Sequence, residues 1–418
     1  MRIAYLNPCG KWGGAETSLR ELLASVRQAE PSWELWLLLA EDGPLARIAE
    51  ELGVRVAVVP FPPALAKLGD AASSGGPWPL LRAGIATLNY AHGLARWLRQ
   101  VKPDIIHTNG FKMHLLGARA RPRKTPLVWH IHDYVGSRRL AGRLLRWLGG
   151  SCNVAVVNSN SVASDVQRLL PALRTVTIYN AIDVERFSPS GATIDLDAAA
   201  GLAPAGEGTI RVGLVATFAR WKGHQVFLDA LTRLPSDVPV RGYIIGGPIY
   251  QTDGSQWSLE ELRQKVEGLQ LTGKVGFTGF LDDPAAAMRS LDVIIHASTA
   301  PEPFGMVIIE GMACGKPVIA SQAGGAAELF VDGENALGYP PGDADMLAGQ
   351  ITRLARDPDL RHRIGEAARA TAERTYQGQR LAQELTAVYR NLSGAGIELA
   401  RAGTPHSSLP KGASRRAG

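Results

Sequence analysis

Glu302-Pro-Phe-Gly-Met-Val-Ile-Ile-Glu310 places two carboxylates on either side of a Pro-Phe-Gly turn, with seven residues between them. The apolar residues after the turn predict the start of a helix, and Gly305 lets the backbone approach a ligand closely. The free N–H groups of such a helix start can bind an anion, and carboxylates accept hydrogen bonds from pairs of hydroxyl groups. The stretch therefore predicts a site for a phosphorylated, polyhydroxylated molecule such as a sugar nucleotide.

Strands are predicted on both sides of this stretch. Asp292-Val-Ile-Ile-His-Ala-Ser298 has the pattern of a buried strand that ends in small polar residues. Cys314-Gly-Lys-Pro-Val-Ile-Ala-Ser321 ends the helix and begins another strand, and Ala323-Gly-Gly-Ala-Ala-Glu-Leu329 follows. This unit resembles the family 4 retaining glycosyltransferases. The resemblance covers about Met1 to Leu392 and implies the α/β fold GT-B, in which two Rossmann-like domains face each other across a cleft and a C-terminal helix crosses back to the first domain.

The length and composition of the chain indicate a globular protein with more than one domain. It has 418 residues, of which 45% are hydrophobic and 20% are charged, and this is long for a single core. No apolar run approaches the roughly 18 residues that span a bilayer, and the first residues lack the apolar segment of a secretion signal. We therefore expect a cytoplasmic protein. The three cysteines are far apart, which argues against disulfide bonds and a structural zinc site.

Alternating strand and helix patterns predict the domain boundaries. We expect a first, acceptor-binding domain at residues 1–185, a linker at 186–208, a nucleotide-sugar-binding domain at 209–376, a crossover helix at 377–392 and a disordered basic tail at 393–418. Within the first domain, Pro62 to Pro79 is predicted to be a flexible surface loop. The predicted strands are Arg2–Leu6, Glu34–Ala40, Val54–Val59, Ile105–Thr108, Leu127–His132, Val154–Asn158, Ile210–Ala216, Arg241–Gly246, Val275–Thr278, Val293–His296 and Pro317–Ala320.

The donor site is expected to draw on both domains. Gly13 and Gly14 lie between the first strand and the first helix, where N–H groups converge on an anion, although a tight turn alone would explain the pair. The family has a GG loop here that closes over the donor, and Glu310 resembles the acid that binds the ribose. The full set that we expect to bind the donor is Gly13, Gly14, Thr217, Gly247, Phe280, Phe304, Gly305, Met306, Val307 and Glu310.

Two basic residues are candidates for stabilising the leaving group. A positioned Lys or Arg stabilises the negative charge that develops on a departing diphosphate. Lys222 matches the lysine of the family, but the family arginine lies five residues earlier, where this chain has Thr217. Arg220 is therefore expected either to supply that charge from a shifted position or to be an ordinary surface residue.

Two further residues are expected to act in catalysis through the family resemblance. Glu302 resembles the acid that faces the hydroxyl groups of the sugar. His132 aligns with a histidine beside the donor sugar, whereas His130 is expected to be structural. The two histidines lie on one face of a strand, but without further ligands at a suitable spacing they make a poor zinc site.

No metal and no cofactor are expected. Asp195-Leu-Asp197 and Asp343-Ala-Asp345 match the pattern of metal-dependent sugar transfer, but neither ends a predicted core strand. We predict that both are solvated turns, and that side chains and helix ends stabilise the leaving group.

Positive charge is concentrated in one part of the chain. Residues 78–148 carry 13 Lys or Arg and 2 acidic residues, whereas residues 149–393 carry a net charge of about −6. A solvated surface or an anionic partner would both explain this excess. A helix predicted from Ser137 to Leu148 would place Arg139, Arg143 and Arg146 on one face and Leu140, Leu144, Trp147 and Leu148 on the other. The helix is either a buried amphipathic helix or a peripheral contact with an anionic membrane. The second alternative fits the resemblance, because the family often acts on acceptors at the inner membrane face.

The resemblance implies transfer of a sugar from a nucleotide diphosphate sugar to a hydroxyl group, with retention of configuration. The acceptor would be a glycan, a lipid-linked molecule or a small molecule, in the synthesis of bacterial surface polysaccharide, lipid-linked glycan or glycolipid; nucleic acid is not an expected partner. No carboxylate is obviously placed as a nucleophile, which favours a same-face mechanism assisted by the departing phosphate. Two alternatives are a GT-B sugar-nucleotide epimerase or hydrolase, and a nucleotide-sugar-binding subunit that has lost catalysis.

Overall fold

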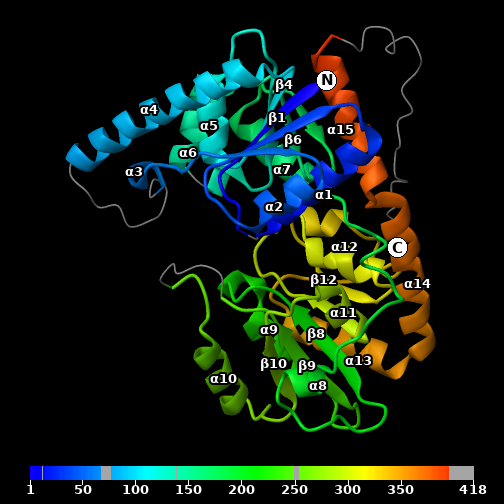
Figure 1. The fold of residues 1–418 in the computed structure, drawn as a ribbon. Coiled ribbons are helices and arrows are strands. Elements are labelled where there is room, and N and C mark those ends of the chain that lie inside the picture. The colour runs from blue at the N-terminus through cyan, green and yellow to red at the C-terminus, as the bar shows by residue number, and fades with distance from the viewer. Residues whose placement is uncertain (12, 67–76, 138, 249–253, 395–418) are drawn as a thin grey trace, which may run out of the picture.

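Parallel strands alternate with helices through two α/β domains, and Figure 1 shows the first domain above the second. The structure is a computed structural model that describes residues 1–394, except for 12, 67–76, 138 and 249–253. The first domain has a seven-stranded sheet with the order β3-β2-β1-β4-β5-β6-β7, and the second has a six-stranded sheet with the order β10-β9-β8-β11-β12-β13. The fold prediction is therefore confirmed.

Helices cover both faces of the first sheet, which is why strands such as β4 and β5 are buried throughout. Helices α1 and α2 pack on one face, and α4 to α7 on the other. The strands are β1 (Arg2–Asn7), β2 (Glu34–Leu39), β3 (Arg55–Val58), β4 (Ile105–Asn109), β5 (Leu127–Ile131), β6 (Val154–Val157) and β7 (Thr175–Thr177). The helices are α1 (Gly14–Ala29), α2 (Pro44–Glu51), α3 (Pro63–Ala66), α4 (Pro77–Val101), α5 (Phe111–Ala120), α6 (Arg139–Leu148) and α7 (Asn160–Leu169), with 3-10 turns η1 (Val135–Ser137) and η2 (Gly149–Ser151).

The second sheet is covered in the same way. Helices α9, α10 and α13 pack on one face, whereas α11 and α12 pack on the other with α14 beside them. The strands are β8 (Ile210–Val215), β9 (Val240–Ile245), β10 (Val275–Gly279), β11 (Val293–His296), β12 (Val318–Ser321) and β13 (Leu337–Tyr339). The helices are α8 (Leu196–Ala199), α9 (His224–Thr232), α10 (Leu259–Gly268), α11 (Pro284–Arg289), α12 (Met306–Ala313), α13 (Ala344–Arg356), α14 (Pro358–Thr375) and α15 (Gly378–Leu392), with 3-10 turns η3 (Arg220–Lys222) and η4 (Gly325–Glu328).

The last helix returns to the first domain. Helix α14 runs along the second domain, and α15 continues upward and packs against α1 (Figure 1). Leu385 and Tyr389 of α15 are fully buried there, and the hydroxyl group of Tyr389 is 2.7 Å from Nδ1 of His107. These contacts make α15 part of the core of the first domain.

The strand predictions agree with the structure to within one or two residues at each end, but β7 and β13 were not predicted. Both contain only three residues, which is too short for a hydrophobic period to stand out. The loop predicted from Pro62 to Pro79 is wrong at both ends, because α3 lies in it and α4 begins at Pro77, a residue that suits a helix start. Residues 67–76 of that loop, and 395–418 of the predicted tail, lie outside the described residues.

Candidate donor-binding site

The candidate site lies where loops follow the carboxyl ends of β8 and β11, the edge at which parallel sheets bind ligands. The loop after β8 passes unusually close to the loop after β11 at Gly223, which has a φ of 77°. A Cβ atom on Gly223 would lie 1.8 Å from the carbonyl oxygen of Ala297, so this approach requires glycine. As a result, Lys222 is brought to the carboxylate of Glu302.

Glu302 is the centre of a buried polar cluster. Nζ of Lys222 lies 2.5 Å from Oε1 of Glu302. On the other oxygen, Oε2, Nε2 of His296 lies at 2.7 Å and the hydroxyl of Ser298 donates at 2.5 Å. Burial alone would raise the pKa of Glu302, but the charge of Lys222 and the hydrogen bond from His296 outweigh it and hold the pKa well below its ordinary value. Glu302 is therefore ionised at neutral pH.

His296 and Ser298 were not among the predicted site residues. Both stand at or just beyond the end of β11, and residues two apart in a strand point to the same side. The polar end of that apolar strand was visible in the sequence, but the partner of these side chains was not. Only the return of the chain at Glu302 shows what they bind.

The Pro-Phe-Gly turn is anchored by its aromatic ring. Phe304 is buried, and its ring centre lies 6.0 Å from that of Tyr179 and 6.4 Å from that of Tyr376. Gly305 is the N-cap of α12 with a φ of 106°, and no side chain caps the helix there. The predicted role for backbone groups from Phe304 to Val307 is compatible with this geometry, since the Phe304 ring itself points into the core.

The first turn of α12 faces α1 of the first domain. The sulfur of Met306 lies 3.9 Å from the hydroxyl group of Ser18 and 3.6 Å from the amide of Asn180. Further along α12, loss of water raises the pKa of Glu310 to about 7, and the nearby charge of Arg186 only partly offsets this while Glu21 of α1 adds to it. Glu310 therefore lies at the boundary between the domains.

The Gly13-Gly14 loop begins α1 as predicted. Gly13 is the N-cap in an extended conformation and makes no side-chain cap. A Cβ atom on Gly13 would lie 2.8 Å from Oε2 of Glu16, whose other oxygen, Oε1, accepts a hydrogen bond from the side chain of Asn7. The contact between Ser18 of α1 and Met306 of α12 brings this end of α1 to α12.

His132 follows β5 in the first domain. Its Nε2 atom lies 3.2 Å from Oδ1 of Asn109, and its carbonyl oxygen accepts a hydrogen bond from Asn158 at 3.3 Å. Burial lowers the pKa of His132 to about 4, so the ring is neutral at pH 7. Two residues later, the hydroxyl group of Tyr134 donates to the carbonyl oxygen of Glu302 at 3.2 Å, which brings this segment to the Glu302 loop.

The remaining predicted residues form two separate groups. Gly247 packs against Phe280, because a Cβ atom on Gly247 would lie 2.8 Å from the ring, and 61% of Phe280 is exposed. Thr217 is half-buried, and the next residue, Phe218, bonds through its N–H to the carbonyl of Gly247. The guanidinium of Arg220 instead contacts α10: it lies 2.8 Å from Glu261 and 3.7 Å above the ring of Trp257.

The prediction of two solvated Asp-x-Asp turns is wrong for Asp197. This side chain is buried, and one carboxylate oxygen accepts hydrogen bonds from Arg241 and Tyr243 at 2.6 Å each. Burial opposes ionisation, but these two partners lower the pKa of Asp197 to about 2. Asp195 and Asp343 cap helices α8 and α13. Among the residues that the structure describes, no group of three or more His, Cys, Asp or Glu side chains is placed to hold a metal ion.

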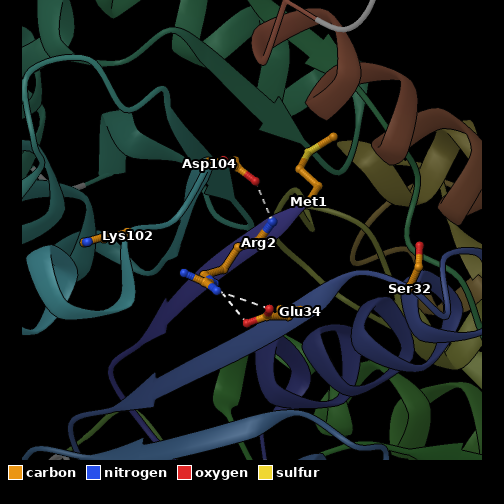
Figure 2. Close-up of a pocket in the computed structure, with 6 residues that line it drawn as sticks. All are labelled: Met1, Arg2, Ser32, Glu34, Lys102 and Asp104. Atoms are coloured by element: carbon orange, nitrogen blue, oxygen red, sulfur yellow. Dashed lines mark hydrogen bonds and ion pairs between the residues drawn. The ribbon is translucent and has the colours of Figure 1, made fainter.

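A pocket of about 300 Å³ lies at the opposite edge of the first sheet, at the amino ends of β1 and β2 (Figure 2). Arg2 is already paired with both carboxylates of this pocket. The guanidinium of Arg2 lies 2.9 Å from Glu34, and the N–H of Arg2 donates to Asp104 at 2.7 Å. The predicted site residues are elsewhere, and this pocket carries none of them.

A second polar contact joins the domains at η4. The carboxylate of Glu328 accepts hydrogen bonds from the backbone N–H groups of Asn160 and Ser161 at 2.8 and 2.7 Å. These are the first two residues of α7, whose free N–H groups favour an anion. The hydroxyl group of Tyr179 also donates to Glu328 at 3.1 Å. The second domain thus caps a helix of the first.

Comparison with protein families assigns both domains. Residues 12–186 match the family described as Glycosyltransferase Family 4, and residues 204–371 match the family described as Glycosyl transferases group 1. The chain belongs to the family 4 glycosyltransferases. Within the described residues of this glycosyltransferase, no helix is long and apolar enough to cross a membrane.

Relatives of this glycosyltransferase have several substrates in their names. It is 24% identical to N-acetyl-alpha-D-glucosaminyl L-malate synthase of Bacillus anthracis over 61% of this chain and 64% of that protein. It is 27% identical to phosphatidyl-myo-inositol mannosyltransferase of Mycolicibacterium smegmatis over 88% of this chain and 94% of that protein. Among solved structures, it resembles HepE of Anabaena in complex with UDP and glucose, with a TM-score of 0.75 and 26% identity over 94% of this chain and all of that one.

Proposed function

We propose that this glycosyltransferase moves a sugar from a nucleotide diphosphate sugar to an acceptor hydroxyl group with retention of configuration. The pair formed by the buried Glu302 and the partly buried Lys222 beside the start of α12 carries this proposal. It offers one cation for a diphosphate and one carboxylate for sugar hydroxyl groups. The UDP, UDP-glucose and UDP plus glucose complexes of HepE support a nucleotide sugar as the donor.

Four of the predicted side chains, together with the backbone at the start of α12, have roles in this scheme. Lys222 stabilises the charge that grows on the diphosphate, and backbone N–H groups at the start of α12 bind its oxygens. Glu302 accepts hydrogen bonds from the sugar, and Glu310 from the ribose. His132, neutral at pH 7, donates or accepts a hydrogen bond near the reacting centre. The departing phosphate takes the proton of the acceptor on the same face.

The acceptor distinguishes this function from its alternatives. Wild-type protein is first screened by thermal shift against UDP-, GDP-, ADP- and dTDP-sugars, and nucleoside diphosphate release is then measured with the donor that binds. Transfer requires release that depends on added glycan, lipid-linked or small-molecule acceptor. Release of nucleoside diphosphate without acceptor would indicate a hydrolase. Interconversion of donor sugars would indicate an epimerase, and donor binding without turnover would indicate a subunit that has lost catalysis. Thr217, which stands where the family has arginine, is the feature that favours the last alternative.

We also propose that transfer needs no metal. Lys222 and the start of α12 supply the positive field that a metal would otherwise provide. Activity of the wild-type enzyme is therefore expected to survive EDTA. Loss of activity that manganese or magnesium restores would overturn this part of the proposal.

For the acceptor side, we propose that α6 docks on an anionic membrane at the cytoplasmic face. Of the two alternatives for this helix, the exposure of Leu144 and Trp147 favours a surface contact over burial of the apolar side chains. Leu144 is 47% exposed and Trp147 80% exposed, beside the exposed Arg143 and Arg146, whereas Leu145 is buried. The side chain of Arg139 lies outside the described residues.

An exposed arc of cations and large apolar side chains suits the boundary between lipid headgroups and acyl chains. Ile85 and Leu88 of α4, on the same side of the sheet, are exposed as well. The relative named for phosphatidyl-myo-inositol mannosylation supports a lipid-linked acceptor.

A further inference from the structure

The two oxygens of the Glu302 carboxylate have different surroundings. Oε2 faces His296 and Ser298, which are only 2% and 1% exposed. Oε1 faces Lys222, whose side chain is 19% exposed and whose amine lies 4.2 Å above the partly exposed ring of Trp221. One oxygen is therefore enclosed by protein, and the other lies on the accessible side.

The enclosed side is held by the framework of the sheet. His296 ends β11, which lies between β8 and β12, and it is in register with Ala320. The carbonyl oxygen of Ser298 accepts a hydrogen bond from Ser321 at 2.7 Å. Because these groups belong to neighbouring central strands, their positions depend little on whether the site is occupied.

The chemistry of the cluster fixes the direction of its hydrogen bonds. An ionised carboxylate has only acceptor positions, so His296 donates through Nε2 and Ser298 through its hydroxyl group. Lys222 donates to Oε1 and is a compact cation on a flexible side chain. Lys222 is thus the partner that can leave without disturbing the strand ends.

We propose that His296, together with Ser298, positions Glu302 by holding Oε2, so that Oε1 has one exchangeable partner: Lys222 in the empty enzyme and a sugar hydroxyl group when the donor diphosphate takes Lys222. This inference rests on the proposed sugar-nucleotide function. It makes His296 a positioning residue for recognition of the sugar and not of the nucleotide. The negative diphosphate and the sugar would then enter the site in a coupled exchange.

The test compares His296→Phe, which keeps a ring but has no donor, with His296→Gln, whose side-chain amide can replace the Nε2 donor. Binding of UDP and UDP-glucose to the full chain is measured by calorimetry, and both variants are crystallised without ligand. His114→Phe is the matched control, since His114 is a buried histidine of the first domain with its own hydrogen bond to Thr108.

His296→Phe is expected to weaken UDP-glucose binding by about 10- to 150-fold, the range for loss of a hydrogen bond to a charged group, and to leave UDP binding within about twofold. His296→Gln should restore most of the UDP-glucose affinity, and His114→Phe should leave the ratio of the two affinities unchanged. In the unliganded crystals, Glu302 should leave its place in His296→Phe and keep it in His296→Gln.

An equal loss of UDP and UDP-glucose binding, or an unmoved Glu302 in His296→Phe, would overturn the positioning role. If the wild-type protein binds neither nucleotide and turns over no donor, it is the proposed function that has failed. The unliganded crystals of the two variants would still decide whether His296 positions Glu302.

Discussion

Glu302 and Glu310 stand at the two ends of the same short segment, but their surroundings shift their pKa values in opposite directions. Lys222 and His296 keep Glu302 ionised, whereas burial keeps Glu310 close to half-protonated at neutral pH. Two acids that look equivalent in the sequence therefore respond differently to substitution.

Glu302→Ala is expected to lower transfer by about a hundredfold or more, because at least one hydrogen bond from sugar to a charged group is lost. Binding of UDP should remain as tight as in the wild type, because removal of the carboxylate leaves Lys222 free for the diphosphate. Calorimetry measures the affinity for UDP, and steady-state kinetics measures the transfer rate. A UDP affinity that falls tenfold would show that Glu302 contacts the nucleotide.

Glu310→Gln is expected to change stability with pH. The folded-state pKa of about 7 lies above the ordinary value of 4.5, so the protonated acid favours folding at low pH and this contribution is lost as the pH rises through about 7. The variant should match the wild type at pH 4.5 and exceed it at pH 8 by at most about 3 kcal/mol. Urea unfolding at both pH values measures this.

The same variant should bind nucleotide about 10- to 150-fold more weakly, because a neutral amide replaces a charged acceptor for the ribose. Glu334→Gln, an exposed acid in a turn, is the control. Equal stability of Glu310→Gln and the wild type at pH 8 would contradict the raised pKa, and unchanged nucleotide affinity would contradict the ribose role.

Lys222→Ala is expected to lower turnover more than it raises the donor Michaelis constant, because the charge on the leaving group grows in the transition state. Arg220→Ala should be much less damaging, since Arg220 is bound to Glu261 and stacked on Trp257. Steady-state kinetics of both variants decide the question. Equal losses would mean that Arg220 does replace the family arginine that is absent at Thr217.

At the scale of elements, the function proposed for α6 depends on the exposure of its apolar side chains, which the sequence pattern alone does not give. The full chain is expected to sediment with anionic vesicles at low salt and to be released as salt rises, since each arginine near an anionic surface contributes on the order of 1 kcal/mol. Arg143→Gln with Arg146→Gln should reduce binding by about 30-fold, and Trp147→Ser should reduce it severalfold. Sedimentation with phosphatidylglycerol and phosphatidylcholine vesicles measures it.

The control for α6 removes the same charge elsewhere. Arg353→Gln with Arg363→Gln changes two exposed arginines of the second domain and should leave vesicle binding as in the wild type. Equal recovery in the supernatant with both lipids at low salt would end the membrane proposal. An equal loss in the control variant would mean that only overall charge matters.

At the scale of the whole molecule, the two domains are held by α15 and by polar contacts across their boundary. Glu328 accepts two N–H groups from the start of α7, and such bonds to a charged group contribute roughly 1.5 to 3 kcal/mol each. Glu328→Ala should therefore shift the molecule toward more open arrangements. Small-angle scattering without ligand should show a larger radius of gyration than the wild type and the control Glu334→Ala; an unchanged radius would contradict this.

The sequence by itself determined the two α/β domains, the crossover helix and the family, because hydrophobic period, glycine turns and the spacing of Glu302 and Glu310 are local properties. It also singled out Lys222 as a candidate partner for a diphosphate. The strands β7 and β13 were not predicted, because three residues are too few to show a hydrophobic period.

The tertiary structure alone decided which distant side chains meet. His296 and Ser298 enclose one oxygen of Glu302, Arg220 turns to Glu261, and Asp197 is buried against Arg241 instead of lying in a solvated turn. The exposure of Trp147 was decided in the same way. The physical reason is that these contacts depend on how closely loops from separate strands approach each other in space. The order of residues along the chain does not give those distances.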